Sequence, residues 1–171
     1  EVPGLKELNA VDAAGVHPLL FAIGSERYTP YLEVVKPQEL LTIANRILGT
    51  NQLSLAKFLF IAAQEDNASL KTTDHYKFLI HMLERVDFTS DLHFQTNTTI
   101  DTLDYSGDGI NSGSKVVIAA VGPAKYQLLE REVAIPDHAS KCVMPGVLAV
   151  KSAPFTNYST VEQDIAKLEA A

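Results

Sequence analysis

The sequence predicts an α/β fold built on a mostly parallel sheet with helices on both faces. Three compact apolar runs, at residues 17–24, 58–63 and 115–121, have the length of strands and little polar alternation. Between them, residues 37–48 and 73–86 carry apolar side chains at helical spacing. Continuous apolar strands separated by amphipathic helices are typical of parallel sheets that are covered on both faces.

The two helices have recognisable ends. Pro37 suits the first turn of the first helix, and Gly49 suits the position just past its end. In the second helix, Thr72 or Thr73 can cap the start, and Leu79 lies on the face that we expect to be buried.

Shorter elements are expected further along the chain. Residues 92–94, 98–103 and 147–150 have the composition of short strands. Ser159 with Glu162 forms a capping-box pattern, which predicts the start of a last helix. Strand and helix are therefore expected up to the end of the chain.

The chain is expected to divide into a main α/β domain, residues 1–123, and an extension, residues 124–171. The extension holds an irregular segment followed by a strand and a helix, and we expect it to pack on the same domain. The first residue is Glu1 rather than Met, from which we expect a processed or excised piece.

Charge and composition exclude several kinds of partner. The net charge is −7, from 14 Lys and Arg against 21 Asp and Glu, without a basic cluster. Nucleic-acid binding and attraction to an anionic membrane are therefore not expected, and no apolar run is long enough for membrane insertion. Cys142 is the only cysteine, so no internal disulfide can form, and a cytoplasmic location is expected.

Glu65 and Asp66 are the best-placed acids for a ligand site. They follow the strand expected at 58–63, at the carboxyl end where open α/β sheets bind ligands. A solvated turn explains the same pair without any ligand. The sequence has no nucleophile elbow, HExxH or GxGxxG pattern, so no catalytic residue is predicted.

The glycine-rich loop at 104–115, DYSGDGINSGSK, imitates two ligand-binding motifs. Asp104 and Asp108 stand at the first and fifth positions of a calcium loop, but Lys115 stands where a bidentate Glu is needed. Ser114 breaks the Gly-Lys-Ser/Thr order that a phosphate-binding loop requires. We therefore predict no metal site and a tight turn between two strands.

The order of segments, taken with their residues, resembles the C-terminal domain of UbiD-type decarboxylases. The resemblance covers residues 15–121 and includes Gly-Val-His at 15–17 and AKFLFI at 56–61. Its most specific parts are NTTIDTLD at 97–104, close to the family's Asn-Thr-Pro-Ile-Asp-x-Leu-Asp, and Gly-Ser-Lys at 113–115.

Three departures from the family pattern accompany these matches. Thr89 and Thr99 stand where a Pro is common, and the strand after Lys115 lacks the frequent Asp-Ala-Thr ending. Residues 124–171 have no counterpart in compact members and are similar to the longer, menaquinone-type branch.

The resemblance implies Rossmann-like layering and a supporting role in a decarboxylase of aromatic acids in ubiquinone or menaquinone biosynthesis. The family's prenylated FMN, its divalent metal (usually manganese) and its Glu-Arg-Glu/Asp catalytic set belong to an upstream flavin-binding domain, and nothing in this chain matches those motifs. The C-terminal domain of the family builds the homo-oligomer and lends an apolar wall to the substrate pocket. By register, Ile100 and Leu103 are placed on that wall, and plain core packing explains them equally well.

Two alternatives remain open from the residues alone. One is a free-standing binding module of flavodoxin-like or Rossmann-like type. The other is a complete small enzyme that uses Glu65 or Asp66 as a base.

Overall fold

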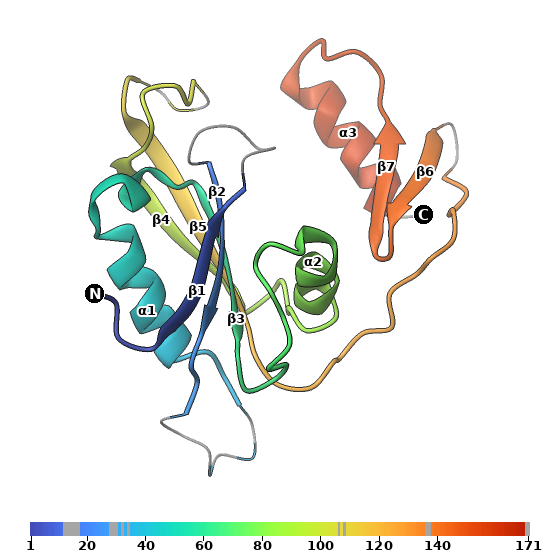
Figure 1. Cartoon of the computed structure of the whole chain (residues 1–171). Helices are drawn as coiled ribbons and strands as arrows, with labels where there is room; N and C mark the ends of the chain where they lie inside the picture. The colour runs from blue at the N-terminus through green and yellow to red at the C-terminus, as the bar shows by residue number, and fades with distance from the viewer. Residues whose placement is uncertain are drawn as a thin grey trace. The chain divides into compact units, whose positions relative to one another are not determined.

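Figure 1 shows a computed structural model, which describes residues 1–11, 18–27, 31, 33, 35–105, 107, 109–135 and 138–169. The chain forms two compact units, Glu1–Tyr126 and Gln127–Ala171. A division into compact units does not by itself show independent domains, so the domain boundary expected after residue 123 stays a prediction. Among the described residues, no helix has the length and apolar character needed to cross a membrane.

The first unit is built on a five-stranded sheet with the strand order β1-β2-β3-β5-β4. Its strands are β1 (Leu5–Ala10), β2 (Leu19–Gly24), β3 (Phe58–Ala63), β4 (Leu92–Thr99) and β5 (Ser112–Ala120). β2, β3 and β5 run parallel to one another, whereas β1 pairs with β2 and β4 pairs with β5 in the antiparallel sense. The sheet is therefore mixed, and the prediction of a mostly parallel sheet is not confirmed.

Helices cover both faces of this sheet, as the α/β prediction requires. Successive side chains of a strand point to opposite faces, and the buried residues of the central strands accordingly fall into two clusters. Helix α1 (Glu39–Leu48) packs on one cluster, next to the short 3-10 helix η2 (Asn51–Leu55), and α2 (His75–Leu83) packs on the other. Figure 1 shows the two helices on opposite sides of the sheet.

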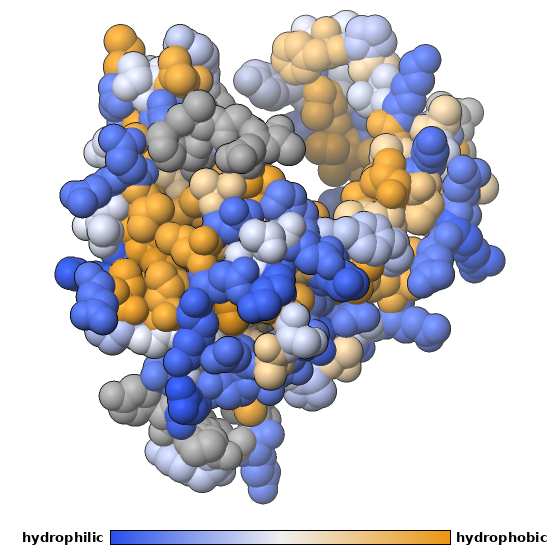
Figure 2. All heavy atoms as spheres, in the orientation of Figure 1, coloured by the Kyte–Doolittle hydropathy of each residue, from blue (hydrophilic) through white to orange (hydrophobic). Residues whose placement is uncertain are grey.

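The layer under α1 is not fully covered. Hydrophobic side chains from β1, α1, η2 and the start of the chain pack against this cluster but stay partly exposed: Val2, Leu5, Leu8, Leu41 and Leu53. Figure 2 shows hydrophobic residues gathered over the α1 and β1 region of the first unit.

The buried face of α2 differs from the predicted one. Phe78 and Met82 are buried, whereas Leu79 is only half-buried. Phe78 stacks on Phe21 of β2, with ring centroids 4.5 Å apart. The apolar stripe of this helix is broad enough for either face to be buried, and the aromatic contact with β2 decides between them.

The cap of α2 also differs from the prediction. The side chain of Asp74 accepts a hydrogen bond from the backbone N–H of Lys77 at 3.2 Å, so Asp74 is the N-cap. The hydroxyl of Thr72 instead donates to the Glu7 carboxylate at 2.7 Å, which ties the loop before α2 to β1.

β4 is one strand where the sequence suggested two. It continues through an irregular pairing between Gln95 and Thr98, where Asn97 has a φ of 54°. It ends at Thr99, so residues 100–103 form a turn and the strand expected at 98–103 is wrong beyond Thr99.

The second unit consists of a hairpin and a helix. Strands β6 (Ala139–Met144) and β7 (Val147–Lys151) pair antiparallel, and α3 (Tyr158–Glu169) follows. The sequence predicted β7 and α3 but missed β6. Asn157 caps α3 by accepting the Thr160 backbone N–H at 3.0 Å, so the helix begins before the expected capping box of Ser159 and Glu162.

Candidate functional site

The carboxyl ends of the three parallel strands meet at one edge of the sheet and bring several polar residues together. Residues 25–27 follow β2, Glu65 and Asp66 follow β3, and Gly122 follows the end of β5. This is the edge where open α/β sheets bind ligands, and both acids that the sequence predicted lie on it.

Glu65 is held by donors from the loop after β2. Its carboxylate accepts hydrogen bonds from the Ser25 hydroxyl at 3.0 Å and the Glu26 backbone N–H at 2.9 Å, and it pairs with the Arg27 guanidinium at 3.2 Å. Burial alone would raise the pKa of Glu65, but the hydrogen bonds and Arg27 outweigh it, and the pKa lies below its usual value. Donors of this chain therefore stabilise Glu65 in its carboxylate form.

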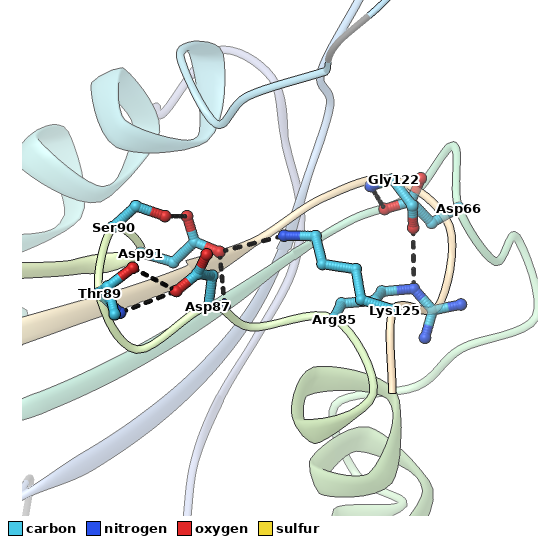
Figure 3. A network of polar contacts seen from close by, with 8 residues as sticks. All are labelled: Asp66, Arg85, Asp87, Thr89, Ser90, Asp91, Gly122 and Lys125. Atoms are coloured by element: carbon cyan, nitrogen blue, oxygen red, sulfur yellow. Dashed lines mark hydrogen bonds and ion pairs between the residues drawn. The ribbon is translucent and has the colours of Figure 1, made fainter. Parts of the chain in front are cut away.

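Asp66 ties the end of β3 to the end of β5. Its carboxylate accepts the Gly122 backbone N–H at 2.8 Å, and Figure 3 shows this contact with Arg85 beside it. Burial raises the pKa of Asp66 above its usual value, although the Gly122 hydrogen bond and the Arg85 charge act against the rise. The Arg85 Nε donates to the Gly122 carbonyl at 3.0 Å. Through Gly122, these two hydrogen bonds connect the ends of β3 and α2 to the end of β5.

Glu26 caps the start of helix α1, a role that the sequence analysis did not predict. Its carboxylate accepts the backbone N–H groups of Gln38, Glu39 and Leu40 at 2.9, 3.0 and 3.1 Å. It thereby satisfies the free donors at the start of α1 and complements the helix dipole. No local signal could reveal this cap, because the acid stands 12 to 14 residues before its donors.

A second polar network closes the turn between α2 and β4 (Figure 3). The Asp91 carboxylate accepts the Asp87 backbone N–H at 2.9 Å and lies 3.6 Å from the Lys125 ammonium. Asp87 in turn accepts hydrogen bonds from both the backbone and the hydroxyl of Thr89, at 2.9 and 2.6 Å. The network thus stabilises this turn, and the carboxylates of Asp87 and Asp91 both have partners in it.

The turn after β4 separates the two residues predicted for a substrate-pocket wall. Ile100 is fully buried and packs against Gly113, where an added Cβ would lie 2.7 Å from the Ile100 side chain. Leu103 is 64% exposed. Ile100 thus packs in the core of this chain, and of the two only Leu103 offers apolar surface to a ligand or partner.

Further large apolar side chains are exposed on the same turn. Tyr105 and Ile110 are 87% and 84% exposed. Asn111 fixes the base of the turn, because its side-chain amide donates to the Ile100 carbonyl at 3.1 Å and to the Thr102 hydroxyl at 2.9 Å. The described residues of this turn therefore expose three large apolar side chains, Leu103, Tyr105 and Ile110, next to the hydrogen bonds of Asn111.

The lysines next to the glycine-rich loop have partners within the fold. Lys115 is buried, its ammonium donates to the Ser54 carbonyl, and burial lowers its pKa. Lys57 pairs with Asp104 at 2.8 Å. Ser106 and Asp108 of the loop, like the Gly-Val-His motif at 15–17, lie outside the described residues.

A family model matches most of the chain. Residues 1–120 match the family described as the 3-octaprenyl-4-hydroxybenzoate carboxy-lyase C-terminal domain. A Chlamydia trachomatis protein is 41% identical over 121 residues, which are 71% of this chain and 19% of that protein. A Chlamydia pneumoniae protein, whose name describes it as one subunit of a 4-hydroxybenzoate decarboxylase, is 37% identical over 124 residues, 72% of this chain and 19% of that protein. The chain thus spans 19% of the length of these curated relatives.

Two solved structures share the fold at low sequence identity. The open form of the vanillic acid decarboxylase of Sedimentibacter hydroxybenzoicus matches with a TM-score of 0.55 at 18% identity, over 99% of this chain and 30% of that chain. The UbiD-class enzyme HmfF of Pelotomaculum thermopropionicum, solved in complex with FMN, matches with a TM-score of 0.54 at 14% identity, over 79% of this chain and 27% of that chain.

Proposed function

Because the chain belongs to the UbiD family of decarboxylases, through that family's C-terminal domain, we propose that it is a non-catalytic part of an enzyme that decarboxylates an aromatic acid. The family match over residues 1–120 is the observation that carries this proposal. The decarboxylase name of the Chlamydia pneumoniae relative supports 4-hydroxybenzoate or a related acid as the substrate.

The acids of this chain support a non-catalytic role. A general base needs a carboxylate that can reach a substrate proton, but Glu65 and Asp66 both accept hydrogen bonds from the backbone of neighbouring loops. If either acid moved towards a substrate, it would lose the hydrogen bond that connects it to the loop after β2 (Glu65) or after β5 (Asp66). These contacts support a structural role for both acids over the small-enzyme alternative.

The cofactors of the proposed enzyme, prenylated FMN and a divalent metal such as manganese, would be held by an upstream flavin-binding domain. Two observations on the described residues support this assignment to another domain. These residues contain no cluster of three or more His, Cys, Asp or Glu that could hold a metal ion. Lys115, the lysine of the glycine-rich loop, is buried, and its ammonium donates to the Ser54 carbonyl rather than facing solvent.

In the complete enzyme, Leu103 would contribute to the apolar wall of the substrate pocket, with Ile100 supporting it from the core. The exposure of Leu103, Tyr105 and Ile110 on one turn supports a surface that another domain covers. The partly exposed apolar layer over α1 and β1 (Figure 2) supports a second contact surface, either with the flavin-binding domain or with a second copy.

The same family assignment supports a proposal for the cellular setting. We place the enzyme in the cytoplasm, in ubiquinone or menaquinone biosynthesis, where carboxyl groups are removed from aromatic precursors. The single cysteine, Cys142, is compatible with a reducing compartment.

The experiment compares Leu103→Asp with Phe88→Asp in the complete enzyme supplied with prenylated FMN, manganese and 4-hydroxybenzoate. Leu103 and Phe88 are 64% and 61% exposed, so both variants should fold normally. We expect kcat/KM to fall at least about tenfold in Leu103→Asp, because a charge enters an apolar pocket wall. We expect Phe88→Asp to keep normal turnover.

Normal turnover in Leu103→Asp would show that Leu103 is not at the pocket. The isolated chain, assayed in the same way, should release carbon dioxide only at the background rate, since the flavin supplies the electron sink. Turnover by the isolated chain that disappears in Glu65→Gln would instead support the small-enzyme alternative.

A further inference from the structure

Strand β4 leaves one edge of the five-stranded sheet open. Among the described residues, β5 is the only strand that pairs with it. The regular part of this pairing runs from Leu92 to Gln95, before the irregularity between Gln95 and Thr98. The decarboxylase role proposed above makes no use of this edge.

Every second residue of β4 turns its backbone groups away from β5. The Ala119 N–H donates to the Asp91 carbonyl at 3.2 Å, so Asp91 is hydrogen-bonded to β5. Hydrogen-bonded and outward-facing residues alternate in an antiparallel ladder, so Leu92 and Phe94 present their N–H and C=O groups to the open edge. A row of such groups is a template for a further strand.

The two edges of the sheet differ in their protection against further pairing. At the other edge, β1 carries Lys6 and Glu7 next to an irregularity in its own pairing, and charged side chains and bulges keep additional strands away. The β4 stretch from Leu92 to Thr96, LHFQT, has no Lys, Arg, Asp, Glu or Pro. In a chain with a net charge of −7, two copies can therefore meet at this stretch without bringing acids together.

An apolar row of side chains crosses the sheet and ends at the open edge. Phe58 of β3 and Phe94 of β4 both pair with Val116 of β5, so the three side chains share one face of the sheet. Val116 is buried, whereas Phe58 is 41% and Phe94 is 67% exposed. The row thus ends on its most exposed side chain, and a further strand with an apolar residue opposite Phe94 would bury it.

We propose that two copies of this chain pair antiparallel through their β4 edges, about a two-fold axis at Phe94. In this register the two Phe94 residues face each other and exchange two backbone hydrogen bonds, and Leu92 of each copy faces Thr96 of the other. The apolar rows of the two copies join, and their two sheets become one continuous sheet. This contact is self-complementary, so it uses both open β4 edges and leaves neither for a third copy.

The small size of the contact sets its expected strength. Residues 92–96 of each copy form its centre, whereas a standard stable interface buries about 1,600 Å² with about 20–30 residues on each side. We therefore expect an equilibrium between monomer and dimer, with a dissociation constant on the order of 10–100 micromolar.

The test is sedimentation velocity of the whole chain between about 1 micromolar and about 1 millimolar, a range that brackets this dissociation constant. We expect the dimer fraction of the wild type to rise with concentration. Phe94→Lys and Phe94→Glu each place two like charges opposite each other at the axis, and each should weaken the dimer at least about tenfold. Tyr76→Lys, at a 54% exposed position on α2, is the control and should dimerise as the wild type does.

An equimolar mixture of the two Phe94 variants tests the register. In the mixed dimer the introduced ammonium and carboxylate groups face each other across the axis. The mixture should therefore dimerise at least about threefold more tightly than either variant alone.

The proposal fails if the wild-type chain stays monomeric up to about 1 millimolar, or if the folded Phe94→Lys variant dimerises as tightly as the wild type. It also fails if the mixture dimerises as weakly as the separate variants, because the two positions then do not face each other. Should circular dichroism show that the Phe94 variants do not fold, Thr96→Lys, at another exposed position of the same edge, decides the question by the same comparison with the wild type.

Discussion

The two units of the chain differ in what their helices bury. In the first unit, α1 and α2 each cover a layer of buried side chains on the sheet. In the second unit, no described residue is buried, and α3 leaves Ile165 48% exposed. The first unit therefore has its own core, whereas the second, Gln127–Ala171, offers only a hairpin and a helix.

This difference bears on the stability of each unit. A two-stranded hairpin is marginal in water, and a short helix draws most of its stability from packing of its apolar face. The second unit leaves Phe155 and Tyr158 65% and 80% exposed, in edge-to-face contact with ring centroids 5.5 Å apart. Its large apolar side chains thus stay mostly exposed, and we expect the second unit to gain order from a partner surface.

The largest effect is expected in the core of the first unit. Phe78→Ala should lower the free energy of unfolding by about 3–5 kcal/mol, because a fully buried ring stacked on Phe21 is replaced by a cavity. Tyr76→Ala, at a 54% exposed position of the same helix, should cost far less, within about 0.5 kcal/mol. Urea unfolding followed by circular dichroism measures both, and equal costs would contradict the observed face of α2.

An intermediate effect is expected at the carboxyl edge of the sheet. Glu65→Gln should cost about 1–2 kcal/mol at pH 7, because one acceptor oxygen and the charge opposite Arg27 are lost. The pKa of Glu65 is lowered on folding, so its contribution is present above the unfolded value of 4.5 and is lost as the pH falls through the lower, folded value.

The difference in stability between wild type and Glu65→Gln should therefore shrink below pH 4.5. Urea unfolding at a series of pH values measures it. A difference that stays constant down to pH 2 would mean that the charge of Glu65 does not stabilise the fold.

The smallest effect is expected in the second unit. Ile165→Ala should change the free energy of unfolding of the isolated chain by no more than about 0.5 kcal/mol, since the side chain is 48% exposed. Thermal unfolding detects a larger change. A loss above 1 kcal/mol, a cost expected of buried rather than exposed side chains, would show that α3 has a covered face in solution.

The sequence predicted the elements whose signals are local. β3 lies at 58–63 as expected, because a compact run of apolar residues ends in a polar turn. β1 was missed, since an edge strand of mixed composition, LKELNA, carries no periodic signal. The antiparallel direction of β1 and β4 also escaped prediction, because only pairing partners distant in sequence determine it.

The sequence by itself determined the α/β class, the family resemblance and the position of Glu65 and Asp66 at the carboxyl edge of the sheet, since strand length and residue order are properties of short segments. Only the tertiary structure decided what those acids do. The Asp66 carboxylate accepts a hydrogen bond from the N–H of Gly122, which lies 56 residues further along the chain. The Glu65 carboxylate accepts one from the N–H of Glu26, which follows β2 and lies 39 residues before it. The same holds for Ile100 and Leu103, which stand three residues apart yet lie in the core and on the surface, because packing against Gly113 of β5 selects one of them.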